Sequence, residues 1–132
     1  MRAVHLAVGG VGLIVFFATG LYMRSKFPAS YESNETIRYL YRASHNYILY
    51  VALLNLAVGT YLLRPVSGWR RRVQGVGSIL LLLAPLLLVW AFFVEPPLAV
   101  PERPRTALGA ACTLAGTLLH VLAGAMSRSR EE

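Results

Sequence analysis

Three histidines lie inside apolar stretches of the sequence, where an imidazole needs a partner or a ligand. His5 is followed one helical turn later by Gly9. His120 has Gly116 and Gly124 one turn away on either side. Two neutral imidazoles from facing helices can ligate haem iron, and small residues beside each ligand leave room for the flat macrocycle. His5 and His120 are therefore candidate ligands of a haem b, although the same glycines also suit close helix packing.

A second group of polar side chains lies toward the opposite ends of the apolar stretches. Arg42, His45, Glu95 and Arg103 share one membrane face, and Asn55 lies deeper. Titratable groups gathered in one place can mark a site, and this level suits lipid or quinone head groups. The structural alternative is a lock in which the Glu95 carboxylate pairs with an arginine or with His45. The chain has no aspartate, no HExxH and no GxSxG, so neither a catalytic residue nor a metal site is predicted.

The second apolar stretch opens with the letters RASHN. Its Arg42, Ala43 and Asn46 resemble the motif that opens the second helix in the membrane-associated family of eicosanoid and glutathione metabolism, whose members are small four-helix proteins. The resemblance implies a glutathione-type enzyme. The position of that family's glutamate is apolar here, and its later segment rich in arginine and tyrosine is not evident. A lipid, quinone or glutathione-type membrane enzyme or carrier that uses Arg42, His45 and Glu95 is therefore an alternative function.

The composition places the chain in a membrane. Of its 132 residues, 56% are hydrophobic and 14% are charged, whereas a soluble domain carries about 25% charged residues. A helix needs about 20 mostly apolar residues to cross the hydrocarbon core of a bilayer. The sequence therefore predicts an all-α integral membrane protein with a single domain over residues 1–132. The predicted fold is an up-down bundle of four transmembrane helices at about 3–23, 34–64, 74–95 and 105–126.

The second of these helices is predicted to begin outside the bilayer. Ser33 or Asn34 can cap it, and Glu35 suits the positive N-terminal end of a helix. At 1.5 Å per residue this helix would be about 46 Å long and would project beyond the membrane at its start. Pro65 is expected to stop it.

Helical spacing predicts the face on which each polar side chain lies. In the second stretch, Tyr41, His45 and Asn55 fall on one narrow stripe with small residues, because a helix turns by about 100° per residue. Such stripes face the protein interior in membrane bundles. His5 and His120 lie on the equivalent stripes of their own helices, so these polar side chains are expected to point inward. The two histidines differ in predicted depth by about 5 Å, which a helix tilt would correct.

The net charge of +7 comes from basic residues that flank the apolar stretches. This placement is typical of anchors at an anionic lipid surface, and it makes the bilayer, not nucleic acid, the expected partner. An even number of crossings puts both termini on one side. The two sides carry nearly equal numbers of Lys and Arg, and the short basic turn from Arg64 to Arg72 favours that side as cytoplasmic. The sequence predicts a bacterial inner-membrane protein with both termini in the cytoplasm.

The absence of a catalytic motif in the sequence favours a non-catalytic role. We predict an accessory, assembly or structural subunit that contacts other membrane subunits or a second copy of itself. Apolar faces with tyrosines and stripes of small residues suit such helix contacts. The first alternative is a b-type haem electron carrier with His5 and His120 as ligands, and the second is the membrane enzyme or carrier described above.

Overall fold

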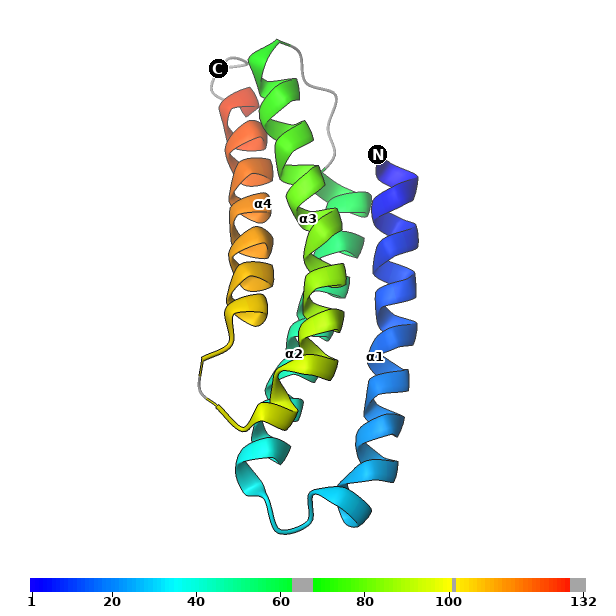
Figure 1. Ribbon diagram of the computed structural model, residues 1–132. Coiled ribbons are helices and arrows are strands. Elements are labelled where there is room, and N and C mark those ends of the chain that lie inside the picture. Colours follow the sequence, from blue (N-terminus) through cyan, green and yellow to red (C-terminus); the bar gives the residue numbers. More distant parts are fainter. Residues whose placement is uncertain (63–67, 101, 129–132) are drawn as a thin grey trace.

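Four long helices make up the protein in a computed structural model, which describes residues 1–62, 68–100 and 102–128. The helices are α1 (Arg2–Ser30), α2 (Glu35–Ala57), α3 (Trp69–Val94) and α4 (Pro104–Arg128). They alternate in direction, so the start of α1 and the end of α4 lie at the same end of the bundle (Figure 1). No strand occurs in the described residues. The predicted all-α, up-down, four-helix fold is confirmed.

Three helical segments are long and apolar enough to cross a membrane, namely Arg2–Ser30, Trp69–Leu98 and Pro104–Gly124. Helix α2 is shorter and less apolar. It runs antiparallel to α1 and α3 and lies beside them (Figure 1). If α1 and α3 cross the bilayer, α2 must cross it in the opposite direction. Large apolar side chains such as Ile14 and Leu86 point outward, as lipid-facing positions require. The chain is therefore an integral membrane protein.

The start of α2 agrees with the predicted cap. The Asn34 side-chain oxygen accepts a hydrogen bond from the Ile37 backbone N–H at 3.0 Å, which satisfies one of the free donors of the first turn. At its other end, α2 continues as a short π-helix over Val58–Leu62. The predicted continuation to residue 64 and the stop at Pro65 lie outside the described residues.

Helices α1 and α3 extend beyond the predicted spans. Helix α1 continues through the exposed Arg24 and Lys26 and ends at Ser30. Helix α3 begins at Trp69 because its first turn is anchored on α4. The Arg70 guanidinium donates to the Ala123 backbone oxygen at 3.3 and 3.1 Å. Basic side chains in such turns are typical of anchors at the membrane surface.

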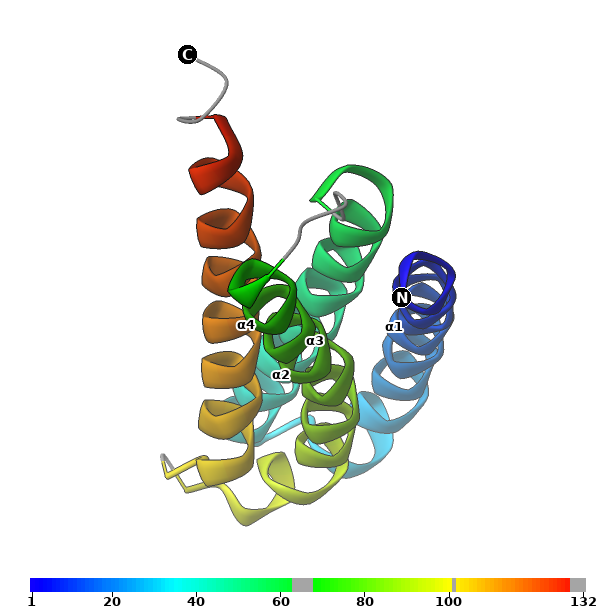
Figure 2. The same cartoon turned by 90° about the horizontal axis from the view of Figure 1, so that it is seen from above.

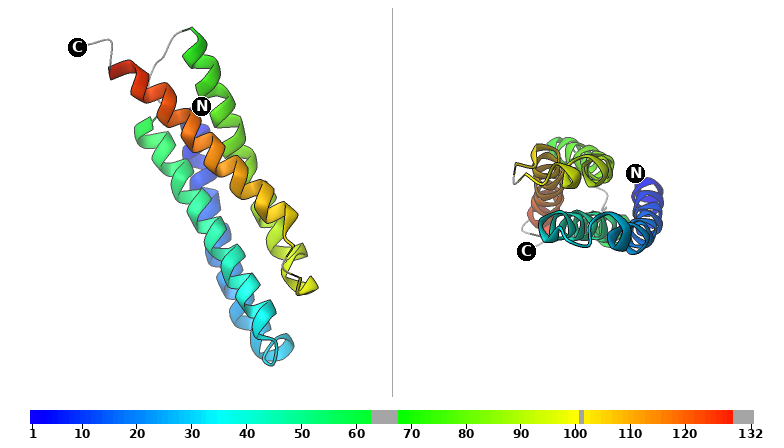
Figure 3. Two further views of the ribbon diagram at one scale, coloured as in Figure 1. Left: turned by 90° about the vertical axis from the view of Figure 1, so that its left-hand side faces the viewer. Right: turned by 60° about the horizontal axis from the view of Figure 1, so that its bottom comes forward.

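The helices form two antiparallel hairpins, α1 with α2 and α3 with α4, which are displaced along the bundle axis. The first hairpin projects beyond the connection between α3 and α4 at one end, and the second hairpin extends further at the other (Figures 1 and 3). Seen from above, α1 packs beside α2 and lies away from α4 (Figure 2). The displacement of the two hairpins along the axis decides which residues of α1 lie at the same height as which residues of α4.

Glycines bring the helices of each hairpin close together. A Cβ on Gly116 of α4 would lie 2.8 Å from the backbone oxygen of Gly77 in α3. A Cβ on Gly12 of α1 would lie 2.8 Å from the Cβ of Ala52 in α2. Real Cβ atoms do not approach so closely, so the stripes of small residues pack helix against helix.

Replacing Gly116 with alanine is expected to lower the free energy of unfolding by about 1–2 kcal/mol, because the Gly77 carbonyl can move aside only if α3 and α4 separate. Gly10→Ala is the matched control. Nothing lies within 4 Å of its added Cβ, and alanine favours a helix over glycine by about 1 kcal/mol. Titration with SDS in mixed micelles measures both variants. Equal unfolding midpoints would contradict the close approach of α3 and α4.

Candidate functional site

His5 of α1 and His120 of α4 meet inside the bundle. Their ring centroids are 5.9 Å apart, and the ring planes meet at 85°. Both side chains are buried, with exposed fractions of 0% and 1%. The sequence predicted that His5 and His120 lie at different depths, because α1 begins just before His5 whereas α4 continues well past His120. The displacement of the two hairpins along the axis offsets this difference. The two candidate ligands are therefore brought together.

Asn55 of α2 holds one ring nitrogen of His5. The Asn55 amide nitrogen donates to the backbone oxygens of Val51 and Leu81, at 2.9 and 3.0 Å. Its side-chain oxygen lies 2.8 Å from His5 Nδ1, and an oxygen can only accept, so Nδ1 carries the proton and donates. The lone pair of a neutral His5 is then on Nε2. Asn55 joins α1, α2 and α3 at one level of the bundle.

Ser78 of α3 holds His120 in a similar way, with its hydroxyl oxygen 3.2 Å from His120 Nε2. The other two ring nitrogens, His5 Nε2 and His120 Nδ1, are buried and have no hydrogen-bond partner within residues 1–62, 68–100 and 102–128. Buried polar atoms in native proteins are nearly always paired. One nitrogen of each ring is therefore available to bind a further group.

Two contacts near the pair lie where a haem would extend. A porphyrin between the two rings would lie across the axis that joins them and would extend toward α2 and α3. Asn55 connects α2 to α3 at that level through its bond to the Leu81 carbonyl. Gly116, which was expected to leave room for the macrocycle, packs against Gly77 instead. Gly124, the other glycine beside His120, has nothing within 4 Å of an added Cβ, and haem stays a prediction.

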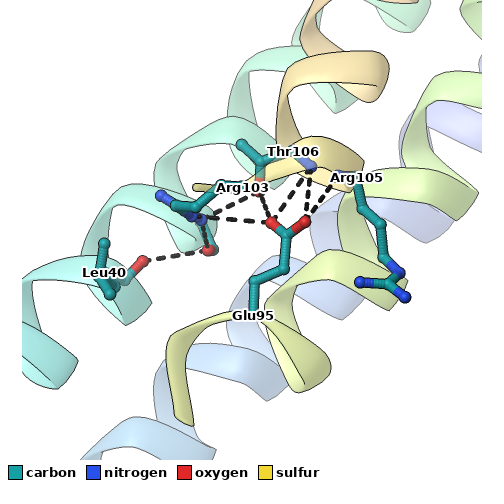
Figure 4. Close-up of polar contacts among 6 residues, drawn as sticks. Leu40, Glu95, Arg103, Arg105 and Thr106 are labelled. Atoms are coloured by element: carbon teal, nitrogen blue, oxygen red, sulfur yellow. Dashed lines mark hydrogen bonds and ion pairs between the residues drawn. The ribbon is translucent and has the colours of Figure 1, made fainter. Parts of the chain in front are cut away.

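The second group of polar residues is centred on Glu95, at the end of α3 (Figure 4). Its carboxylate accepts the Arg105 backbone N–H at 2.6 Å, the Thr106 N–H at 3.2 Å and the Thr106 hydroxyl at 2.6 Å. Glu95 is only 1% exposed. The first turn of a helix has free N–H donors and the positive end of the helix dipole, both of which stabilise an anion. Glu95 therefore caps α4 from the preceding helix.

Arg103 extends this network to α2. Its Nε lies 3.7 Å from Glu95 Oε2, and its guanidinium donates to the Thr106 hydroxyl at 3.0 Å and to the Ser44 hydroxyl. The Ser44 hydroxyl donates in turn to the Leu40 backbone oxygen at 3.0 Å (Figure 4). Three helices thus meet at one buried ion pair. This arrangement corresponds to the structural lock that the sequence offered as an alternative.

His45 contacts α1 and does not join the network of Glu95 and Arg103. The His45 ring stacks on Phe16 of α1, with the centroids 4.0 Å apart, and its Nδ1 lies 2.9 Å from the Thr19 hydroxyl oxygen. That hydroxyl donates to the Phe16 backbone oxygen, so His45 Nδ1 is the donor to Thr19. Arg42 is exposed. The predicted polar cluster is therefore divided among three places: Glu95 with Arg103, His45 with α1, and Asn55 with His5.

Sequence reasoning did not assign the hydroxyl side chains that complete both sites, Ser44, Ser78 and Thr106. Thr106 carries one usable signal, because it lies in the first turn of α4, where free backbone donors attract an acceptor. Ser44 and Ser78 carry no such signal, since a serine inside a helix commonly bonds to the preceding turn of its own helix.

Comparisons of the chain with family models, with curated proteins and with solved structures found no match. In the described part of the chain, no group of three or more His, Cys, Asp or Glu side chains is placed to hold a metal ion. The sites of this protein are therefore interpreted from their own geometry.

Proposed function

We propose that the protein is a non-catalytic accessory, assembly or structural subunit of a complex in the bacterial inner membrane. The observation that carries this proposal is an apolar groove between α1 and α3, with a volume of about 400 Å³. Its walls are formed by Ala7, Val8, Val11, Gly12 and Val15 of α1 and by Leu82, Pro85, Leu86 and Val89 of α3. A groove of this kind in the membrane offers a surface to another apolar element and holds nothing that could do chemistry.

The groove suits a transmembrane helix of a partner subunit. Its lining residues recur three or four positions apart on each wall, and ridges of another helix pack into surfaces with that spacing. Ala7 and Gly12 add little bulk, which permits close approach. From Ala7 to Val15 the α1 wall is about 12 Å long at 1.5 Å per residue, so it would contact about two turns of the docked helix. A helix there would cover the side of α1 that faces α3, next to the face that packs on α2 through Gly12.

The contacts of Glu95 and Arg103 favour a subunit over an enzyme. Both carboxylate oxygens of Glu95 accept hydrogen bonds from the start of α4, and Arg103 bonds to Ser44 and Thr106. Groups engaged in this way hold the helices of one chain together. They would have to break those bonds before they could bind a head group or glutathione.

The basic residues support the proposed orientation. Arg71 and Arg72 are exposed at the start of α3, at the end of the bundle where α1 also begins (Figure 1). Short basic turns favour the cytoplasmic side of a membrane. We therefore include in the proposal that both termini lie in the cytoplasm.

Filling the groove is expected to release the partner. Val11 lines the groove and is 58% exposed, so Val11→Trp would occupy the groove without disturbing the core. Leu118→Trp is the matched control, because Leu118 is 52% exposed on α4 and does not line the groove. After extraction of membranes with a mild polymer, native gels should show the wild type and Leu118→Trp in one larger complex. Val11→Trp should migrate as the 14.5 kDa chain alone.

Three results would contradict the proposal. One is a wild-type chain that extracts alone, and another is a complex that contains only copies of this chain. The third is a complex that Val11→Trp retains, because the partner would then bind elsewhere on the surface.

A further inference from the structure

We infer that His5 and His120 form a binding site for a single Cu(I) ion, with His5 Nε2 and His120 Nδ1 as its two ligands. These are the two buried ring nitrogens that have no hydrogen-bond partner in the described part of the chain. The site goes beyond the proposed role as a subunit, and it assigns to these two histidines a bare metal ion where the sequence analysis considered only haem iron.

The separation of the rings matches two imidazoles on opposite sides of one metal ion. An imidazole nitrogen lies about 2.0 Å from a bound first-row metal ion, and roughly 1 Å from its own ring centre. Two such rings in line with one ion therefore have centres about 6 Å apart. The centroids of His5 and His120 are 5.9 Å apart. The separation of the two ring centres therefore matches that of two imidazoles on either side of one ion.

Each histidine is also held in the way that metal ligands are held. A ligating histidine almost always uses its other ring nitrogen in a hydrogen bond that fixes the ring and its tautomer. His5 Nδ1 bonds to the Asn55 side-chain oxygen at 2.8 Å, and His120 Nε2 bonds to the Ser78 hydroxyl at 3.2 Å. Asn55 is itself fixed by two backbone carbonyls. The protonated Nδ1 of His5 leaves the lone pair of Nε2 available for a metal.

The number of ligands and the cost of burying charge favour Cu(I). Zn²⁺ takes four ligands in structural sites, and Cu(II) prefers a tetragonal set, but no group of three or more ligating side chains occurs in the described residues. Imidazole is a donor suited to copper. Cu(I) forms linear complexes with two donors, so it needs fewer ligands than Zn²⁺ or Cu(II). Neutral imidazoles leave the charge of the ion uncompensated. A single charge costs less to bury than a double one.

The inference is tested on the full chain in detergent under anaerobic conditions, with Cu(I) supplied as its bicinchoninate complex and with competition by that chelator. We expect one Cu(I) ion per wild-type chain. His5→Ala and His120→Ala should each lose stoichiometric binding. His45→Ala is the matched control and should keep it, because His45 lies apart from the pair, against Phe16 and Thr19.

Two further measurements test the inference without relying on the histidine variants, which could fail to fold. X-ray absorption of the copper-loaded wild type should show the intense pre-edge feature of linear two-coordinate Cu(I), with nitrogen neighbours alone. Ser78→Ala should weaken Cu(I) binding by about 10–100-fold, the usual effect of removing a group that orients a ligand.

The inference is overturned by a wild-type chain that binds no copper. Copper with sulfur neighbours, or equal loss of binding in His45→Ala, would also overturn it. None of these results bears on the groove between α1 and α3, so the proposed function is tested separately.

Discussion

Glu95→Ala is expected to lower the free energy of unfolding by about 3–5 kcal/mol, the magnitude found when one partner of a buried ion pair is removed. The Glu95 and Arg103 side chains are only 2% and 13% exposed. Without the carboxylate, the Arg103 charge stays partly buried without its counter-ion, and the Arg105 and Thr106 N–H groups lose their acceptor. The connection from α3 to α4 should loosen first. SDS titration in mixed micelles, followed by circular dichroism, measures the loss.

Glu102→Ala is the matched control for this prediction. It removes the same charge from the same connection, but Glu102 is exposed, so the expected change is well under 1 kcal/mol. Glu95→Gln should fall between the two, because the amide oxygen can still accept one hydrogen bond of the cap. If Glu95→Ala unfolds at the same SDS concentration as Glu102→Ala, the network does not act as a lock.

Asn55→Ala should be the second most destabilising substitution, at about 2–3 kcal/mol. Asn55 makes hydrogen bonds to His5, Val51 and Leu81, and its removal leaves the His5 Nδ1–H and the Leu81 carbonyl buried without these partners. Each buried group left unpaired costs about 1–3 kcal/mol. Single hydrogen bonds between membrane helices average only about 0.6 kcal/mol, so the expected size rests on one side chain serving three helices.

Asn46→Ala is the control that shows whether the loss of stability in Asn55→Ala comes from the contacts of Asn55 or from replacing any asparagine of this helix. Asn46 lies on the same helix and is exposed, so its replacement should change the SDS midpoint little. Combined with His5→Ala, Asn55→Ala should lose less than the sum of the two single variants, because the pair shares a hydrogen bond. Additive losses would show that the bond between His5 and Asn55 contributes nothing to stability.

The sequence predicted the helices well because apolar length and flanking charge are local properties. The Asn34 cap, the start of α4 and the inward faces of His5, Asn55 and His120 follow from spacing along one helix. Extensions such as the turns of α1 before Ser30 were missed because polar helical turns outside the bilayer have no apolar signal.

The neighbours of each inward face could not be predicted. Helical spacing shows which side chains share a face, but it does not show which other helix that face meets. His45 and Glu95 lie at similar predicted depth, yet His45 packs against α1 and Glu95 binds α4. The displacement of the two hairpins, which brings His5 to His120, is likewise a property of packing among all four helices.

The most direct test of the central claim is site-specific photocrosslinking in intact membranes, with a photoreactive amino acid placed at Val11 or Leu86 in the groove, or at Leu118 outside it. The account predicts that both groove positions crosslink to one and the same membrane protein, through one of its transmembrane segments, and that Leu118 does not. Crosslinks from the groove to lipid alone, to a second copy of this chain, or with the pattern seen at Leu118 would contradict the claim that a partner helix occupies the groove.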